Sequence, residues 1–316
     1  MDEVIPGYEH DALFYDSEEE LVASAAPFLR AALDRSEGVV LVCADRNASL
    51  LAEALHGHPR IGTLDRSEVY RRVPAAIATY QRMAESHLAE GADRVRVVGE
   101  IDFDRDDWEE WARFEALSNA VLGPYSLWAL CLYDTRRLRA EVLEAAERTH
   151  PRLITAADRA PNPHYVSPDR FLSEFAAQPD PLESTAPAID MTGAISLHQL
   201  RQEVTALLEA GSGPAVGGRP DLVNGFVFAV SEVATNAMSY GRPPVRVRVW
   251  SAGDRAVCTV TDHGDGFSDP FTGYQSRGHR NVEIDGQGLW MARQLCDVVS
   301  ITREPGAFTV RIISFR

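Results

Sequence analysis

The chain of 316 residues contains no lysine, so all 31 of its basic residues are arginine. A phosphate-binding loop of the Walker type needs a lysine for the terminal phosphates, and this kind of nucleotide site is therefore excluded. The 47 acidic residues give a formal net charge of −16. Because nucleic acids bind to basic patches and none of the arginine clusters is long, we expect no nucleic-acid partner.

Cysteines are few, and long apolar runs are absent. Cys43, Cys131, Cys258 and Cys296 stand alone in apolar surroundings without a CxxC pair. We therefore expect reduced core residues and set disulfide and zinc sites aside. No apolar run approaches the length of a membrane span, and residues 1–10 lack the basic and then apolar order of a signal peptide. These absences predict a cytoplasmic protein that does not enter a membrane.

Length and proline distribution predict two domains. A chain of this length suits two domains of about 130 to 170 residues each, and 45% hydrophobic with 25% charged residues is an ordinary globular composition. Prolines gather over residues 159–187, where we expect a connector. The predicted domains are residues 1–158 and 188–316.

Short apolar runs alternate with helical patterns in the first domain. The runs cover residues 39–43, 95–101 and 126–133, as is typical of strands buried on both faces. Helical spacing covers residues 17–35, with Ser17 as the N-cap, and then residues 48–55, 67–90, 107–122 and 135–148. This alternation predicts a mostly parallel α/β sheet.

The second domain has a different pattern. Strands are predicted near residues 188–191, 245–250, 256–262, 298–302 and 308–315, and helices at 197–210, 221–240 and 288–296. Several strands alternate polar and apolar residues, which is typical of an antiparallel sheet with one solvated face and one face under helices. The prediction is an α/β sandwich.

Two motifs of the second domain place polar groups where a ligand could bind. Glu232 and Asn236 are four residues apart on a predicted helix, so their side chains share one face. Asp262 ends a strand and is followed by Gly264 and Gly266, where the backbone can turn tightly and approach a flat ligand. Each motif alone is usually a surface or turn feature.

A third motif completes the set. Gly286 and Gly288 open a helix, whose free N–H groups and positive dipole end can hold phosphates without a lysine. In this order the three motifs resemble the N, G1 and G2 boxes of the GHKL (Bergerat) ATPases, over about residues 185–316. Residues 231–237 and 288–297 look most like the anti-sigma-factor serine kinases. The resemblance implies a Bergerat fold that binds ATP and Mg²⁺.

The resemblance also implies a role for each residue. Asn236 would be the Mg²⁺ ligand, Asp262 would bind the adenine amino group, and Glu232 would be the general base toward a serine hydroxyl or water. The remaining assignments place Gly264 and Gly266 at the base pocket, Gly286 and Gly288 at the phosphates, and Thr309 behind the adenine-binding aspartate. The family usually has a glycine-threonine pair at this last position, whereas Ala307 and Phe308 intervene here.

Residues 268–285 would form a lid over the nucleotide. From this lid Arg277 and Arg280 could reach the γ-phosphate, although arginines at such positions are usually only solvated.

Polar residues of the first domain recur at strand ends or domain edges, where open α/β sheets bind ligands. Their spacing is similar to that of the MEDS sensory domain, over about residues 8–155, and the segments that carry this likeness are His10, Phe14-Tyr15, Gly99-Glu100, Leu132-Tyr133-Asp134 and Thr149-His150-Pro151. The candidate pocket residues among them are His10, Tyr15, Glu100 and Tyr133. This resemblance implies a RecA-like sheet without the phosphate loop and a small-molecule ligand. Two interpretations stay open: the four side chains line a sensory pocket, or they are buried polar groups that satisfy one another.

Together the resemblances imply a cytoplasmic signalling regulator. A small-molecule-sensing domain would control an ATP- and Mg²⁺-dependent serine/threonine kinase that acts on a sigma factor or an anti-anti-sigma (STAS-type) protein, in a chain that could form a homodimer. One alternative is a nucleotide-gated anti-sigma protein that binds without catalysis. The other is a partner-dependent sensor histidine kinase, which the lack of a recognisable H-box disfavours.

Overall fold

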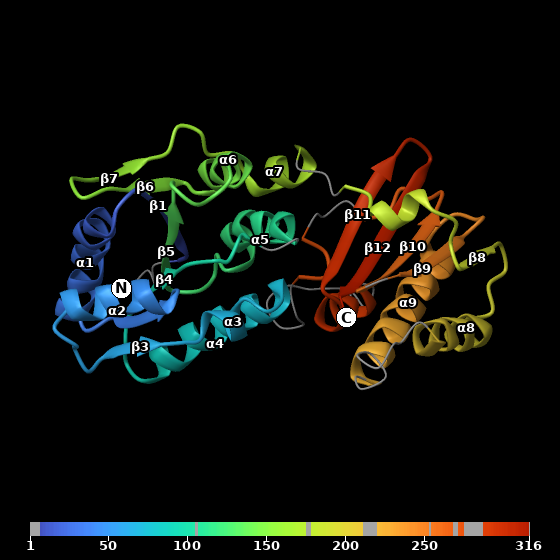
Figure 1. The fold of residues 1–316 in the computed structure, drawn as a ribbon, viewed down its shortest axis with the longest axis horizontal. Coiled ribbons are helices and arrows are strands. Elements are labelled where there is room, and N and C mark those ends of the chain that lie inside the picture. Colours follow the sequence, from blue (N-terminus) through green and yellow to red (C-terminus); the bar gives the residue numbers. More distant parts are fainter. Residues whose placement is uncertain are drawn as a thin grey trace, which may run out of the picture. The chain divides into compact units, whose positions relative to one another are not determined.

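The computed structural model describes residues 7–104, 107–174, 178–210, 220–252, 254–267, 271–274 and 287–315. The chain divides into two compact units, Met1–Phe175 and Ala176–Arg316, each drawn in Figure 1. Within the described ranges, no helix combines the length and the apolar character that crossing a membrane requires.

The first unit is built on a seven-stranded sheet with the order β3-β2-β4-β5-β1-β6-β7. Its strands are β1 (Glu9–Tyr15), β2 (Gly38–Val42), β3 (Ile61–Thr63), β4 (Val95–Gly99), β5 (Leu127–Asp134), β6 (Arg152–Ile154) and β7 (Arg159–Pro161). All neighbours are parallel except β6 and β7. The mostly parallel α/β sheet is thus confirmed, with β1 as a further strand that lies inside the sheet.

The helices of this unit are α1 (Glu18–Asp34), α2 (Asp45–Ala54), α3 (Arg66–Val69), α4 (Val73–Ala89), α5 (Trp108–Val121), α6 (Ala140–Thr149) and α7 (Pro168–Glu174). The Ser17 hydroxyl caps α1, as predicted, by accepting a hydrogen bond from the Glu20 N–H at 3.3 Å. The helix predicted over residues 67–90 is two helices, α3 and α4. Pro74 stands in the first turn of α4, where its missing N–H costs nothing.

Strand alternation gives the first sheet two distinct faces. Helices α1 and α2 cover one face, where Leu29 and Leu51 join a core that includes Leu13 and Leu130. The opposite face carries α5, which packs against α4 and α6. Residues 10 and 15 of β1 are an odd number of positions apart, so their side chains lie on opposite faces of the sheet.

The segment expected to connect the domains carries structure of its own. Strand β7 pairs with β6, and Phe171 of α7 is fully buried against Ala112 and Ala116 of α5. Residues 159–174 therefore belong to the first unit. The connector is shorter than the range 159–187 expected from its prolines.

The second unit is a five-stranded antiparallel sheet with the order β11-β12-β10-β9-β8. Its strands are β8 (Ile189–Thr192), β9 (Arg246–Ala252), β10 (Arg255–Asp262), β11 (Val298–Glu304) and β12 (Ala307–Phe315), and its helices are α8 (Leu197–Ala210), α9 (Pro220–Tyr240) and α10 (Gln287–Leu295). Residues from all three helices share one core with the sheet, including Val204, Phe226, Leu289 and Val247. The predicted α/β sandwich is confirmed.

The other face of this sheet is partly covered by residues 180–185, which we call the strap and which include the 3-10 helix η1 (Pro181–Ser184). Leu182 packs against a small cluster that contains Trp250. The Trp250 indole donates a hydrogen bond to the Thr185 carbonyl at 3.0 Å, and Arg311 is paired with Glu183. The end of the expected connector therefore belongs to the second unit.

Candidate functional site

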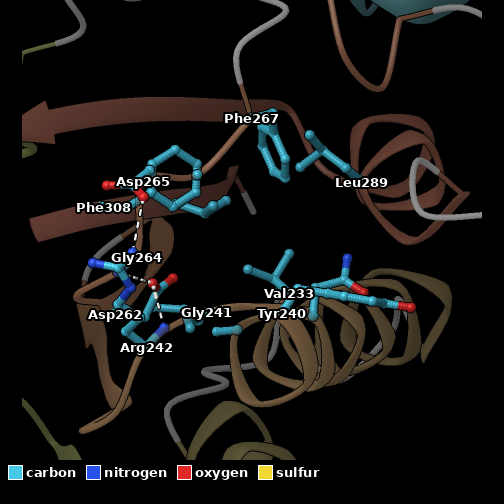
Figure 2. A pocket seen from close by; sticks show the side chains of 15 residues that line it. Val233, Tyr240, Gly241, Arg242, Asp262, Gly264, Asp265, Phe267, Leu289 and Phe308 are labelled. Carbon is cyan, nitrogen blue, oxygen red and sulfur yellow. Dashed lines mark hydrogen bonds and ion pairs between the residues drawn. The ribbon is translucent and has the colours of Figure 1, made fainter.

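The second unit contains a cavity of about 330 Å³ between α9, the strands β10 and β12, and the first turn of α10. Figure 2 shows Phe267 and Leu289 on one side of it and Val233 of α9 on the other. Its volume lies at the lower end of the range of small-molecule pockets, about 300 to 1,000 Å³. Apolar walls facing each other across this space suit a flat ring.

Asp262 places one carboxylate at an end of this cavity (Figure 2). The residue is 5% exposed, and its Oδ1 accepts hydrogen bonds from the backbone N–H groups of Gly264 at 2.6 Å and Arg242 at 3.2 Å. Among the described residues, none donates a hydrogen bond to Oδ2. The carboxylate is thus held by main-chain amides and keeps one oxygen for a donor on a ligand.

Three glycines allow the chain to pack this closely. A Cβ atom at Gly264 would stand 2.8 Å from Asp262 Oδ1, and one at Gly241 would stand 2.5 Å from Asp262 Cγ. Gly266 has φ +64°, and a Cβ there would overlap the Phe308 ring at 2.2 Å. Gly264 and Gly266 therefore shape the cavity by admitting Asp262 and Phe308. Sequence reasoning missed Gly241. The only sequence feature that could have indicated its role is its position directly after the last residue of α9.

Glu232 and Asn236 of α9 face the start of α10. A Cβ atom at Gly288 would stand 3.1 Å from Glu232 Oε2 and 3.0 Å from Asn236 Nδ2. Asn236 also lines the cavity. Both side chains are half-buried. The structure therefore brings an acid, an amide and the N-terminus of α10, with its free N–H groups, together at one side of the cavity.

Some of the expected site lies outside the described residues. Gly286, Arg277 and Arg280 belong to this part, as does most of the expected lid at residues 268–285.

Thr309 does not take the position expected from the sequence. In the pairing of β10 with β12, Phe308 lies opposite Asp262, and both Phe308 and Val310 line the cavity. Because neighbouring side chains of a strand point to opposite faces, Thr309 is turned away from the cavity. Its hydroxyl is hydrogen-bonded to that of Thr261 at 2.9 Å. Main-chain amides, and not Thr309, support Asp262.

Two aromatic residues that sequence reasoning missed complete the cavity wall. Phe267 and Phe308 pack edge to face, with ring centroids 5.1 Å apart and planes at 86°. Phe267 directly follows Gly266 in the sequence, which was the one sign of its position. At the rim, Arg242 Nη2 pairs with the exposed Asp265 at 3.1 Å.

The four candidate pocket residues of the first unit fall into two groups, so they do not line a single cavity. In the first group, the Asn47 amide donates hydrogen bonds to the Tyr15 hydroxyl at 3.1 Å and to Glu100 Oε2 at 2.9 Å. Burial raises the pKa of Tyr15 to about 12. Tyr15 is buried and Glu100 is half-buried, and Asn47 links the two side chains. Glu100 also borders a small cavity of about 70 Å³.

The second group lies on the other face of the sheet and is centred on Glu115. Tyr133 donates a hydrogen bond from its hydroxyl to Glu115 Oε1 at 3.0 Å, and His10 Nε2 lies 3.0 Å from Glu115 Oε2. Sequence reasoning did not select Glu115, which lies on α5 among apolar neighbours.

Comparisons with known protein families agree with these two units. The model of the MEDS domain, the methanogen/methylotroph, DcmR sensory domain, matches residues 9–151. The model of the histidine kinase-like ATPase domain matches residues 194–314. No curated protein matches the chain. The chain is therefore a MEDS sensory domain fused to a histidine kinase-like ATPase domain, the combination of a signalling regulator.

Proposed function

We propose that the ATPase-like domain binds ATP with Mg²⁺ in the cavity beside Asp262 and phosphorylates a serine or threonine of a partner protein under the control of the MEDS domain. The observation that carries this proposal is the buried Asp262 carboxylate. One of its oxygens is fixed by two backbone N–H groups, and the other has no hydrogen bond among the described residues.

The cavity fits an adenine ring. Asp262 Oδ2 would accept a hydrogen bond from the exocyclic amino group, a contact that distinguishes adenine from a 6-oxo purine. Val233 and Leu289 on opposite sides would pack against the two faces of the ring. Phe267 and Phe308 would enclose its edge and exclude water.

The polar side of the cavity fits the phosphates. Asn236 offers an amide oxygen, which is a donor that Mg²⁺ accepts, and the N-terminus of α10 offers backbone N–H groups, which bind phosphate oxygens without a lysine. ATP supplies the transferable phosphoryl group when it is bound. The chain's own contribution is to position this group beside Glu232.

Glu232 lies one helical turn from Asn236, and both side chains lie so close to Gly288 in the first turn of α10 that a Cβ atom there would stand 3.1 Å and 3.0 Å from them. A carboxylate at this place can orient a hydroxyl group and accept its proton as the oxygen attacks. No lysine or cysteine among the described lining residues competes for this role.

The partner class rests on the likeness of residues 231–237 and 288–297 to the anti-sigma-factor serine kinases. We propose a sigma factor, an anti-anti-sigma (STAS-type) protein, or both as the partner. The MEDS domain would bind a small molecule and shift the population of the active ATPase-like domain.

The test uses the full chain with Mg-ATP and the serine-bearing antagonist proteins encoded by the same cell. We expect acid-stable phosphoserine with the wild type and with E209Q, an exposed control on α8. With E232Q, transfer should be at least about 100-fold slower while ATP still binds. ATP binding without transfer by the wild type would refute the kinase and leave a nucleotide-gated binding protein. An acid-labile phosphate would indicate a histidine kinase.

A further inference from the structure

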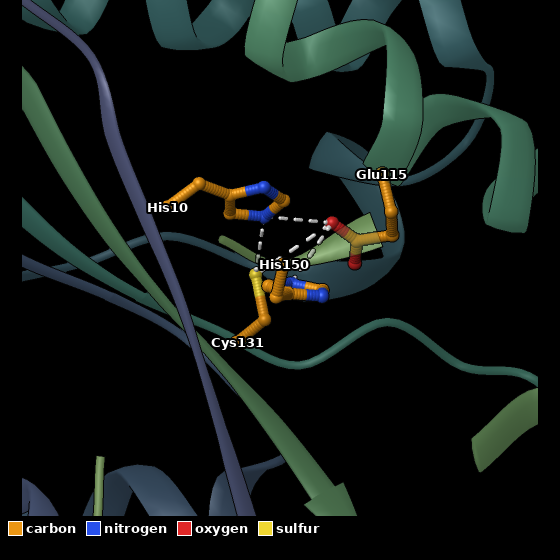
Figure 3. A group of neighbouring side chains, drawn as sticks. All are labelled: His10, Glu115, Cys131 and His150. Atoms are coloured by element: carbon orange, nitrogen blue, oxygen red, sulfur yellow. Dashed lines mark hydrogen bonds and ion pairs between the residues drawn. The ribbon is translucent and has the colours of Figure 1, made fainter. Parts of the chain in front are cut away.

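Four side chains of metal-binding type meet in a buried cluster of the MEDS domain, on the sheet face that carries α5 (Figure 3). They are His10 of β1, Glu115 of α5, Cys131 of β5 and His150, which directly follows α6. One ligand atom of each residue lies within 4.8 Å of those of the other three. The side chains of His10, Glu115 and His150 are at most 3% exposed. This cluster is separate from the nucleotide site.

The distances between these atoms are close to those within one coordination shell, and all of them are within 4.8 Å. Glu115 Oε2 lies 3.0 Å from His10 Nε2, 3.7 Å from His150 Nε2 and 3.7 Å from Cys131 Sγ, and His10 Nε2 lies 3.3 Å from Cys131 Sγ. Tetrahedral zinc, with bonds of about 2.0 to 2.3 Å, places its ligand atoms roughly 3.3 to 3.8 Å apart. An ion at the centre therefore requires only small movements of the side chains.

The hydrogen bonds of the two histidines turn a bare nitrogen toward the cluster. His150 Nδ1 lies 2.8 Å from the Ala146 carbonyl, which can only accept a hydrogen bond. His10 Nδ1 lies 3.2 Å from Asn119 Oδ1, and the Asn119 amide nitrogen is committed as a donor to the Thr149 carbonyl at 2.9 Å. Each Nδ1 thus carries the proton and each Nε2 offers its lone pair to the centre.

One of these nitrogens, Nε2 of His150, makes no hydrogen bond to the described residues. The side chain of His150 is fully buried. A buried nitrogen without a hydrogen bond is costly. A metal ion between this nitrogen and the Glu115 carboxylate would satisfy both.

The surroundings of the four side chains suit an ion. The Tyr133 hydroxyl binds the other oxygen of Glu115, Oε1, and orients the carboxylate. A divalent cation with one thiolate and one carboxylate gives a buried site without net charge, which avoids the cost of an unpaired buried ion.

We propose that His10, Glu115, Cys131 and His150 bind one divalent transition-metal ion. Two imidazoles, a thiolate and a carboxylate in a tetrahedral arrangement favour zinc. Binding forms bonds to the two Nε2 atoms, to Sγ and to Oε2, and breaks the S–H bond of Cys131, whose proton is released to solvent. The ion would tie together two neighbouring strands, α5 and the end of α6.

Cobalt provides a direct probe of this site. The full chain, unfolded with a chelator and refolded with Co²⁺, should bind one equivalent and show a thiolate-to-metal charge-transfer band together with the intense visible bands of tetrahedral Co²⁺. One equivalent of Zn²⁺ should remove these bands. Y133F, which removes a hydrogen bond to a ligand, should weaken metal binding by about 10- to 100-fold.

Cys43 offers a matched control for Cys131. It is also buried and reduced in the first unit, and its Sγ donates to the Val98 carbonyl at 3.2 Å, outside the cluster. C131S should lose the charge-transfer band, whereas C43S should keep it. A band of equal strength in C131S would overturn the proposal. The absence of the charge-transfer band from the wild type would also overturn it, and this result does not depend on how any variant folds. Binding of fluorescent ATP in the same sample reports separately on the nucleotide site.

Discussion

The Oδ1 atom of Asp262 accepts a hydrogen bond from the backbone N–H of Gly264 at 2.6 Å. This contact fixes the carboxylate so that Oδ2 keeps one orientation toward a ligand. The substitution D262N can retain the acceptor for the main chain but replaces the other oxygen with an N–H donor, which cannot accept from the adenine amino group.

We therefore expect D262N to weaken the binding of a fluorescent ATP analogue by about 10- to 150-fold, the equivalent of a lost hydrogen bond to a charged group of about 1.5 to 3 kcal/mol. D265N is the control, because the Asp265 side chain is 88% exposed and its ion pair with Arg242 lies at the rim. Its effect should stay below about fivefold. Equal losses in both variants would argue against adenine recognition by Asp262.

Gly241 is expected to tolerate no side chain. A Cβ atom there would stand 2.5 Å from both Asp262 Cγ and the Ala237 carbonyl oxygen. We expect G241A to lower the free energy of unfolding by about 1 to 3 kcal/mol through overpacking, and to weaken nucleotide binding because Asp262 must move. The measurement is urea unfolding of the full chain followed by circular dichroism.

Gly225, within α9, serves as the control for this substitution. Its added Cβ would meet Leu295 at an ordinary 3.5 Å, and alanine is the better helix former by about 0.5 to 1 kcal/mol. G225A should therefore be neutral or stabilising. A loss as large as that of G241A would show that the effect is not specific to the site.

The strap is expected to contribute to the stability of the second unit. The paired side chains of Arg311 and Glu183 are 5% and 12% exposed. E183A leaves the Arg311 charge buried, and we expect it to lower the free energy of unfolding by about 3 to 5 kcal/mol. In D190A, which breaks the exposed pair of Asp190 with Arg246, the loss should be at most about 1 kcal/mol. Similar urea midpoints for the two variants would contradict this prediction.

The first unit should lose stability in acid partly through Glu9. Burial alone would raise the pKa of this carboxyl, but the guanidinium groups of Arg159 and Arg94 outweigh it and hold the pKa below its ordinary value. Because the pKa of Glu9 is lower in the folded state, the ionised side chain stabilises the fold at pH values above its unfolded-state pKa of about 4.3. This contribution is lost as the pH falls through the folded-state pKa. The free energy of unfolding of the wild type should therefore exceed that of E9Q at neutral pH, and this difference should disappear below about pH 4. Unfolding of both proteins from pH 3 to 7 measures this, and a constant difference over the range would contradict it.

Periodicity predicted most elements of the second unit because its strands alternate and its helices have one apolar face. The predicted runs at residues 245–250 and 256–262 match β9 and β10 within two residues. Thr309 shows the limit of this approach. The sequence placed it in the correct strand, but its face depends on the register of β12 with β10, which places Phe308 opposite Asp262.

In the first unit, β1 escaped prediction because the segment includes His10 and Asp11 and lacks a continuous apolar run. Its burial comes from its neighbours β5 and β6 on either side. Once β1 is a strand, alternation alone separates His10 from Tyr15, so a single pocket could not contain both side chains.

Local sequence patterns were sufficient to predict the fold class of both units, and the absence of lysine excluded a Walker-type phosphate loop. The sequence also supplied the order of the three nucleotide-site motifs, because spacing within a helix or at a strand end is local information. The meeting of His10, Glu115, Cys131 and His150 depends on the three-dimensional fold. These residues share no local motif. They come together because the crossover connections set β5 beside β1 and lay α5 over that face of the sheet.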